Sequence, residues 1–159
     1  MDVQRYRKQV ETALGEAAYE PVDDESTGSF DGVWQTETED PTIGVTEDFA
    51  TVVDASEFDA ETLRETAEEF RRVVTEVAPT KPGGMENVFG YLVCVVADPS
   101  DELVRFATEE YTVADRRTSI FPLIYDLESE TLYKHTVPRL KGRGFYEKQK
   151  LDAESLFLL

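Results

Sequence analysis

Basic side chains gather near the carboxy terminus of the chain, in the segment 134–150. The segment contains one acidic residue, Glu147, and six cations, which are Lys134, Arg139, Lys141, Arg143, Lys148 and Lys150. Three aromatic residues, Tyr133, Phe145 and Tyr146, are interleaved with these cations. Cations combined with aromatic rings can hold a phosphate backbone and stack on exposed bases. The segment therefore predicts a surface that binds nucleic acid or another polyanion, with Tyr146 among its contact residues.

Three other interpretations of the basic segment stay open. Residues 20–69 are rich in acids and contain Arg64 as their one cation, so the basic segment could pair with this acidic surface or with a protein partner. Glycines flank Arg143 in Gly142-Arg143-Gly144, which indicates a flexible, solvated loop. Salt also weakens the nucleic-acid interpretation, because affinity for phosphates falls steeply with salt concentration.

Aspartates at the ends of expected strands form a second candidate site. Asp54, Asp98 and Asp126 each follow an apolar strand, and ligands of open α/β sheets bind beyond the carboxyl ends of parallel strands. Carboxylate oxygens suit Mg²⁺. The metal hypothesis takes Asp31, Asp54 and Asp98 as ligands, and the competing interpretation makes these residues helix caps and turn residues.

The order of the expected elements resembles that of the restriction-endonuclease-like nucleases over about the first two thirds of the chain. That resemblance implies one acid on a strand, here Asp31 or Asp40, and a second acid, Asp54, followed at the next position but one by lysine. The residues after Asp54 are Ala55 and Ser56, so the lysine is missing. The resemblance therefore implies an inactive relative rather than an active nuclease.

The excess of acidic residues points to a salty environment. The chain of 159 residues has 34 acidic and 16 basic residues and a formal net charge of −18. At about 1 M salt the Debye length is roughly 3 Å, so the repulsion between these charges is largely screened. This composition is typical of halophilic archaea that accumulate salt, and an ordinary acidic mesophilic protein is the alternative.

Cys94 and His135 are each the one residue of their type. They exclude an intramolecular disulfide, a cysteine-based metal site and a zinc site with several histidines. The sequence has no apolar run long enough for a membrane span, and its start lacks the apolar stretch of a secretory signal. We therefore expect a cytoplasmic protein without a membrane partner.

Hydrophobic periodicity predicts the elements that would position these residues. Apolar residues recur at helical spacing in 2–19 and again after a capping box at Ser56-Glu57-Phe58-Asp59, and Asp98-Pro99 indicates the start of a short helix that ends near Glu110. Strands are expected at 29–37, 49–53, 88–97, 119–125 and 131–137, and a short helix or docked tail at 152–159. Because Pro122 lacks an N–H, the strand 119–125 is expected at an edge or a bulge.

These elements predict a single α/β domain with the order α-β-β-α-β-α-β-β. The strand 88–97 is apolar on both faces, as expected for a central parallel strand covered by helices. The leading functional hypothesis is a non-enzymatic domain that binds nucleic acid or protein through its basic segment and needs no cofactor. A metal-dependent hydrolase and a homo-oligomer whose acidic and basic faces meet are the alternatives.

Overall fold

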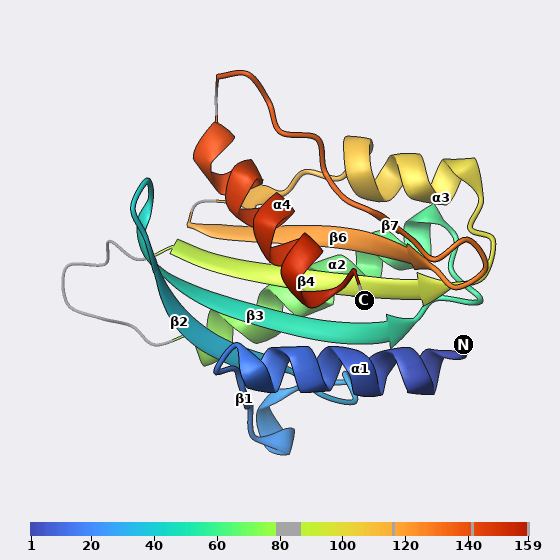
Figure 1. The fold of residues 1–159 in the computed structure, drawn as a ribbon, viewed down its shortest axis with the longest axis horizontal. Helices are drawn as coiled ribbons and strands as arrows, with labels where there is room; N and C mark the ends of the chain where they lie inside the picture. Colours follow the sequence, from blue (N-terminus) through green and yellow to red (C-terminus); the bar gives the residue numbers. More distant parts are fainter. Residues whose placement is uncertain (79–86, 116, 141, 159) are drawn as a thin grey trace.

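A computed structural model of the chain describes residues 1–78, 87–115, 117–140 and 142–158. Their elements, in chain order, are α1 (Val3–Glu16), β1 (Glu20–Pro21), the 3₁₀ turn η1 (Asp24–Ser26), β2 (Trp34–Asp40), β3 (Gly44–Asp54), α2 (Ala60–Val77), β4 (Asn87–Val96), α3 (Asp101–Arg105), the π-helical turn η2 (Phe106–Glu110), β5 (Ala114–Asp115), β6 (Thr118–Asp126), β7 (Thr131–Tyr133) and α4 (Arg143–Leu156). The described strands form one sheet with the order β1-β2-β3-β4-β6-β5, and β7 also pairs with β6 (Figure 1).

The centre of the sheet is parallel. Strand β4 lies between β3 and β6 and runs parallel to both, whereas β2 is antiparallel to β3. The predicted α/β class, the mixed sheet, the element order and the central parallel strand are confirmed. The short strands β1 and β5 and the full length of α4 were not predicted.

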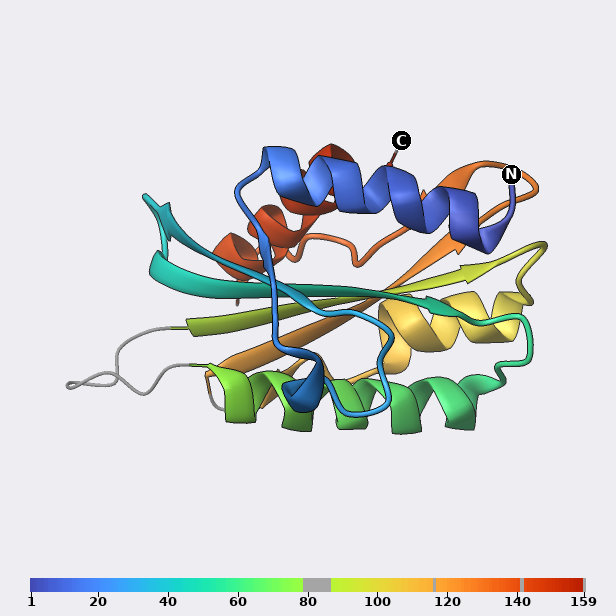
Figure 2. The same ribbon diagram turned by 90° about the horizontal axis from the view of Figure 1, so that it is seen from below.

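Helices cover both faces of the sheet. Helices α1 and α4 lie on one face, and α2 and α3 lie on the other (Figure 2). Successive side chains of β4 point to opposite faces of the sheet. Tyr91, Val93 and Val95 pack in the cluster under α1 and α4, and Leu92 and Cys94 pack in the cluster under α2. Cys94 is fully buried, and burial raises the pKa of its thiol to about 12, which makes it a core residue.

Two helix starts differ from the sequence prediction. Helix α2 is capped by Asp59, whose carboxylate accepts from the N–H of Thr62, rather than by Ser56. Helix α3 is capped by Ser100 rather than by Asp98, which has a positive φ of 50°. In both cases more than one nearby residue is of a type that caps helices, and the chain uses one that follows the expected cap.

Two strand boundaries also differ from the sequence prediction. The first long strand begins at Trp34 instead of residue 29, and β7 ends at Tyr133 instead of residue 137. Strand β6 has neighbours on both sides, but β5 pairs with its residues 118–119 and β7 with its residues 124–126. Pro122 lies between these two ladders, so among the described strands its missing N–H breaks no pairing on that side.

The carboxy-terminal segment is a helix where a loop was expected. Helix α4 begins at Arg143, directly after Gly142, which has a φ of 74°. A Cβ added at Gly144 would lie 3.0 Å from Ile43 and 3.1 Å from Thr42, at the turn between β2 and β3. The two glycines therefore provide a left-handed turn and a close approach to that turn, and the prediction of a flexible loop at 142–144 was wrong.

Candidate functional site

Three of the predicted cations line one surface hollow, which we term the basic hollow. Arg139, Arg143 and Lys150 surround a volume of about 470 Å³, whose other lining residues are Val137, Pro138, Glu147 and Leu151. All three cations are exposed. Arg143 donates from Nε to Glu147 at 2.7 Å, so the basic hollow combines three positive charges with one negative charge.

Exposed leucines accompany the basic hollow. Leu151 lines the hollow and is 64% exposed, and Leu140 follows Arg139 in the chain and is 89% exposed. The large apolar residues exposed in the described chain are these two together with Met1 and Leu158. Apolar groups surrounded by polar ones are typical of surfaces that contact another macromolecule.

Lys148 is not on this surface. Its side chain is 6% exposed, and its ammonium group donates to Asp48 at 2.8 Å, to Asp152 at 2.9 Å and to Thr38 at 3.2 Å. Burial acts to lower the pKa of Lys148, but the two carboxylates outweigh it and raise that pKa. Lys148 therefore fastens α4 to β2 and β3, and it cannot meet a partner without unfolding of the helix.

Lys134, another of the predicted cations, is not among the residues that line the hollow. Lys134 forms an ion pair with Glu154 at 3.6 Å on the same face. Lys141 lies outside the described residues. The described cations of the basic segment are therefore the buried Lys148, Lys134 in its ion pair with Glu154, and the three cations of the basic hollow.

The aromatic residues of the segment are half-buried and pack against the core. Tyr146 lies edge-on to Phe121 with 5.4 Å between ring centroids, and Phe145 lies 5.6 Å from Phe89. Tyr133 packs against the cluster under α2. Base stacking beside the cations would need a ring at the basic hollow, and none of these three rings lines it.

The strand-end aspartates lie at the carboxyl ends of the parallel strands β3, β4 and β6, and the carboxylates of Asp54 and Asp126 are bonded to the chain itself. Asp126 ends β6, which is parallel to β4, and its carboxylate accepts from the N–H groups of Asp98 and Glu128 and from the hydroxyl of Ser129. The carboxylate of Asp54 accepts from both the N–H and the hydroxyl of Ser56. These contacts lower the pKa of both carboxyls, with the Ser56 bonds the leading cause at Asp54; at Asp126 they outweigh a burial effect in the opposite direction.

The other acids proposed as ligands lie elsewhere. Asp31 is in the segment before β2, with a 79% exposed side chain 3.5 Å from Arg7. Asp40 pairs with Gly44 at the start of β3, whereas Asp54 ends that strand, about 33 Å away at the usual rise of a strand. Asp40 and Asp54 therefore cannot share a metal. In the described part of the chain, no three His, Cys, Asp or Glu side chains could hold an ion together.

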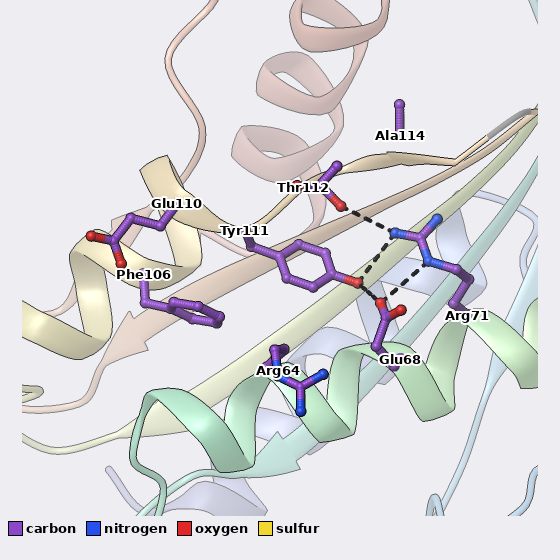
Figure 3. Close-up of a pocket in the computed structure, with 8 residues that line it drawn as sticks. All are labelled: Arg64, Glu68, Arg71, Phe106, Glu110, Tyr111, Thr112 and Ala114. Atoms are coloured by element: carbon purple, nitrogen blue, oxygen red, sulfur yellow. Dashed lines mark hydrogen bonds and ion pairs between the residues drawn. The ribbon is translucent and has the colours of Figure 1, made fainter.

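A second hollow, of about 430 Å³, contains an arginine network that no sequence pattern indicated (Figure 3). Arg71 donates to Glu68, to the hydroxyl of Tyr111 and to the backbone carbonyls of Thr112, Val113 and Thr118. The hydroxyl of Tyr111 donates to Glu68, and burial raises the pKa of Tyr111 to about 12. Since all three guanidinium nitrogens are engaged within the chain, Arg71 joins α2 to the strand edge as a structural clamp.

No protein-family model matches the sequence, and no curated protein is significantly similar to it. Among the described residues, no helix combines the length and the apolar character that a membrane span requires.

Proposed function

We propose that the chain is a binding domain whose basic hollow docks a protein segment that carries carboxylates and apolar side chains. The observation that supports this most is the joint presence of three exposed cations and the exposed Leu151 at one hollow, with the exposed Leu140 next to Arg139 in the chain. The cations complement carboxylates, and the leucines offer contact area that needs no charge. The proposal includes no cofactor and no chemical step.

The positions of the aromatic rings favour a protein over a nucleic acid as the partner. A nucleic acid held by the three cations alone would lose affinity with salt, with a slope of up to about 2 for a single strand. Stacking would offset that loss, but Phe145 and Tyr146 pack against Phe89 and Phe121 and do not line the basic hollow. In the salty cytoplasm that the composition suggests, at about 1 M salt, apolar contact outlasts charge attraction. Leu140 and Leu151 supply such contact.

The test compares two fluorescent probes by anisotropy, from low salt to about 1 M KCl. One probe is a peptide of alternating aspartate and leucine, and the other is a single-stranded oligonucleotide. We expect the peptide to bind at high salt and the oligonucleotide to bind, if at all, at low salt. Tighter oligonucleotide binding that persists at high salt would overturn the proposal in favour of nucleic acid.

Paired variants separate the two parts of the surface. Arg139→Glu with Lys150→Glu, and separately Leu140→Ser with Leu151→Ser, should each weaken the peptide at least tenfold. Arg105→Glu is the matched control, because Arg105 is also exposed but lies at the end of α3, on the other face of the sheet. If the chain self-associates in light scattering and the charge reversal abolishes this, the partner is a second copy and the proposed heterologous segment is wrong.

A further inference from the structure

One edge of the sheet is only partly occupied by the chain itself. Strand β1 pairs with residues 34–35 of β2, whereas β2 continues to Asp40. Among the described strands, none pairs with residues 36–40 of β2 on the side away from β3. Figure 1 shows this part of β2 at the outer margin of the sheet, between β1 and the turn that leads into β3. The sheet can therefore be extended at this edge.

Strand β1 is short because the chain bends at Ala18. In the register of β1, residue 18 would pair with Glu37, but Ala18 has a positive φ of 65° at the point where the chain passes from α1 to β1. A hollow of about 410 Å³ lies here, lined by Ala18 and Glu20 on one side and by Thr36 and Glu37 on the other. The hollow lies where the next residues of a longer strand would pair with β2.

The backbone at this edge has the direction that pairing requires. The N–H of Val22 donates to the carbonyl of Val33 at 2.8 Å, so Val33 directs its backbone groups toward β1. Every second residue along the strand shares this direction, which includes Glu39. No described strand lies beside Glu39 on that side. A row of outward N–H and C=O groups is a template for a further strand, and its hydrogen bonds depend less on salt than an exposed ion pair does.

The charges along the edge define the strand that fits. Residues 20–40 contain eight acidic residues and no lysine or arginine. Glu37 and Glu39 are exposed, and their spacing of two places them on the same face of the sheet. Two copies of this edge would bring their acids together, which disfavours pairing of the chain with itself. A strand with a cation at every second position would instead place its cations opposite these acids.

We propose that β2 binds an extended cationic segment of another protein as an added strand, antiparallel to β2 and in line with β1. The lysine or arginine residues of that segment lie opposite Glu37 and Glu39, because directly paired residues share a face of the sheet. Small or β-branched residues alternate with them and point to the face of Thr36 and Thr38. This surface is separate from the basic hollow, and the inference does not rest on the function proposed for that hollow.

The experiment measures the anisotropy of a labelled peptide in which lysine alternates with threonine or valine, mixed with the whole chain at about 1 M KCl. The peptide should bind with a Kd of about 1 mM or below. Two N-methylated forms of equal charge are then compared. In the proposed pairing the lysine N–H groups face β2, so methylation of the lysines should weaken binding about tenfold or more. Methylation of the other residues, whose N–H groups point away, should leave the affinity unchanged.

Two variants of the chain locate the contact. Glu39→Lys should weaken the peptide about threefold or more, because it replaces an attractive cross-strand pair with a repulsive one. Glu57→Lys is the matched control, since it changes the net charge equally. Glu57 is exposed and follows the end of β3, whereas Glu39 pairs with Val45 near the start of that strand. The control should leave the affinity unchanged.

Several results would overturn the proposal. Absence of binding at about 1 M KCl, or equal effects of the two charge reversals, would leave only diffuse charge attraction. Equal affinities of the two methylated forms would exclude strand pairing, and a greater loss on methylation of the threonine and valine residues would exclude the antiparallel placement. Self-association of the chain in light scattering that the peptide displaces would make a second copy the occupant instead.

Discussion

Replacing Lys148 by methionine tests whether α4 is fastened by a buried ion pair. Methionine preserves the apolar stem and removes the ammonium group, which bonds to Asp48 at 2.8 Å, to Asp152 at 2.9 Å and to Thr38 at 3.2 Å. Asp152 is partly exposed, but the side chain of Asp48 is 1% exposed and would be left without a cation. Removing one partner of a buried ion pair costs about 3–5 kcal/mol. We expect Lys148→Met to lower the free energy of unfolding by that amount.

The measurement is urea unfolding followed by the fluorescence of Trp34, the one tryptophan of the chain. For a protein of this size, each kcal/mol lost from the free energy of unfolding lowers the midpoint of thermal unfolding by about 2–4 °C. That midpoint should therefore fall by about 6–20 °C in Lys148→Met. Lys150→Met is the matched control, because Lys150 lies on the same helix but is exposed. The control should change the free energy of unfolding by no more than about 0.5 kcal/mol.

The pH dependence of the variant provides a second, independent check. Burial raises the pKa of Asp48, and Lys148 opposes that rise in the native protein. Without Lys148 the folded-state pKa of Asp48 lies well above the unfolded one, so the folded state binds an extra proton as the pH falls through it. The destabilisation of Lys148→Met should therefore be largest at neutral pH and decrease as the pH falls. Adding Asp48→Asn to the Lys148→Met variant should restore much of its stability. A loss of less than about 1 kcal/mol in the free energy of unfolding of Lys148→Met, or a loss that does not decrease on acidification, would refute the buried ion pair as the fastening of α4.

Three further predictions concern the core, the arginine clamp and the cap of α2. Gly90→Ala should cost about 1–3 kcal/mol in the same unfolding assay, because its Cβ would lie 2.6 Å from Ile120 in the core. Arg71→Met should cost about 1–3 kcal/mol, since it removes the hydrogen bonds that the guanidinium donates to the carbonyls of Thr112, Val113 and Thr118; an unchanged urea midpoint would contradict the clamp between α2 and the strand edge. Asp59→Ala should lower the thermal midpoint more than Ser56→Ala, and the reverse order would restore the capping box as the start of α2.

The central strand and the first helix could be predicted from the sequence because their apolar patterns are compatible with only one type of element and one kind of burial. Strand β4 is apolar at every position from Tyr91 to Val96, which requires cover on both faces. Helix α1 was predicted from its stripe, of which Tyr6, Val10 and Leu14 are fully buried. In these elements the local pattern and the tertiary packing agree.

The errors occur where one residue type has two structural uses. A glycine indicates a flexible loop, but Gly142 and Gly144 are required by a left-handed turn and a close contact at the start of α4. A serine or an aspartate indicates a helix cap, and the chain offers several before α2 and α3. Only the tertiary contacts select among them.

The ionic networks could not be predicted because they join distant parts of the chain. Lys148 and Asp48 are 100 residues apart, and Arg71 reaches the carbonyl of Thr118 across 47 residues. The spacing of four between Lys148 and Asp152 was a signal for a helical pair once α4 is recognised as a helix. The sequence alone does not indicate that the pair is buried.

The helix α4 explains why cations of one segment have different uses. Residues 149, 153 and 156 fall on its buried face, together with Lys148, whereas Lys150 and Leu151 lie on the exposed side. A charge on the buried face must be paired inside the protein, and its burial fixes the position of the helix. A charge on the exposed face gains little from a neighbour in strong salt, and the leucines beside it gain nothing from water. Their exposure is therefore the observation on which the proposed docking surface rests, and it is the reason that we propose such a surface rather than a charged loop.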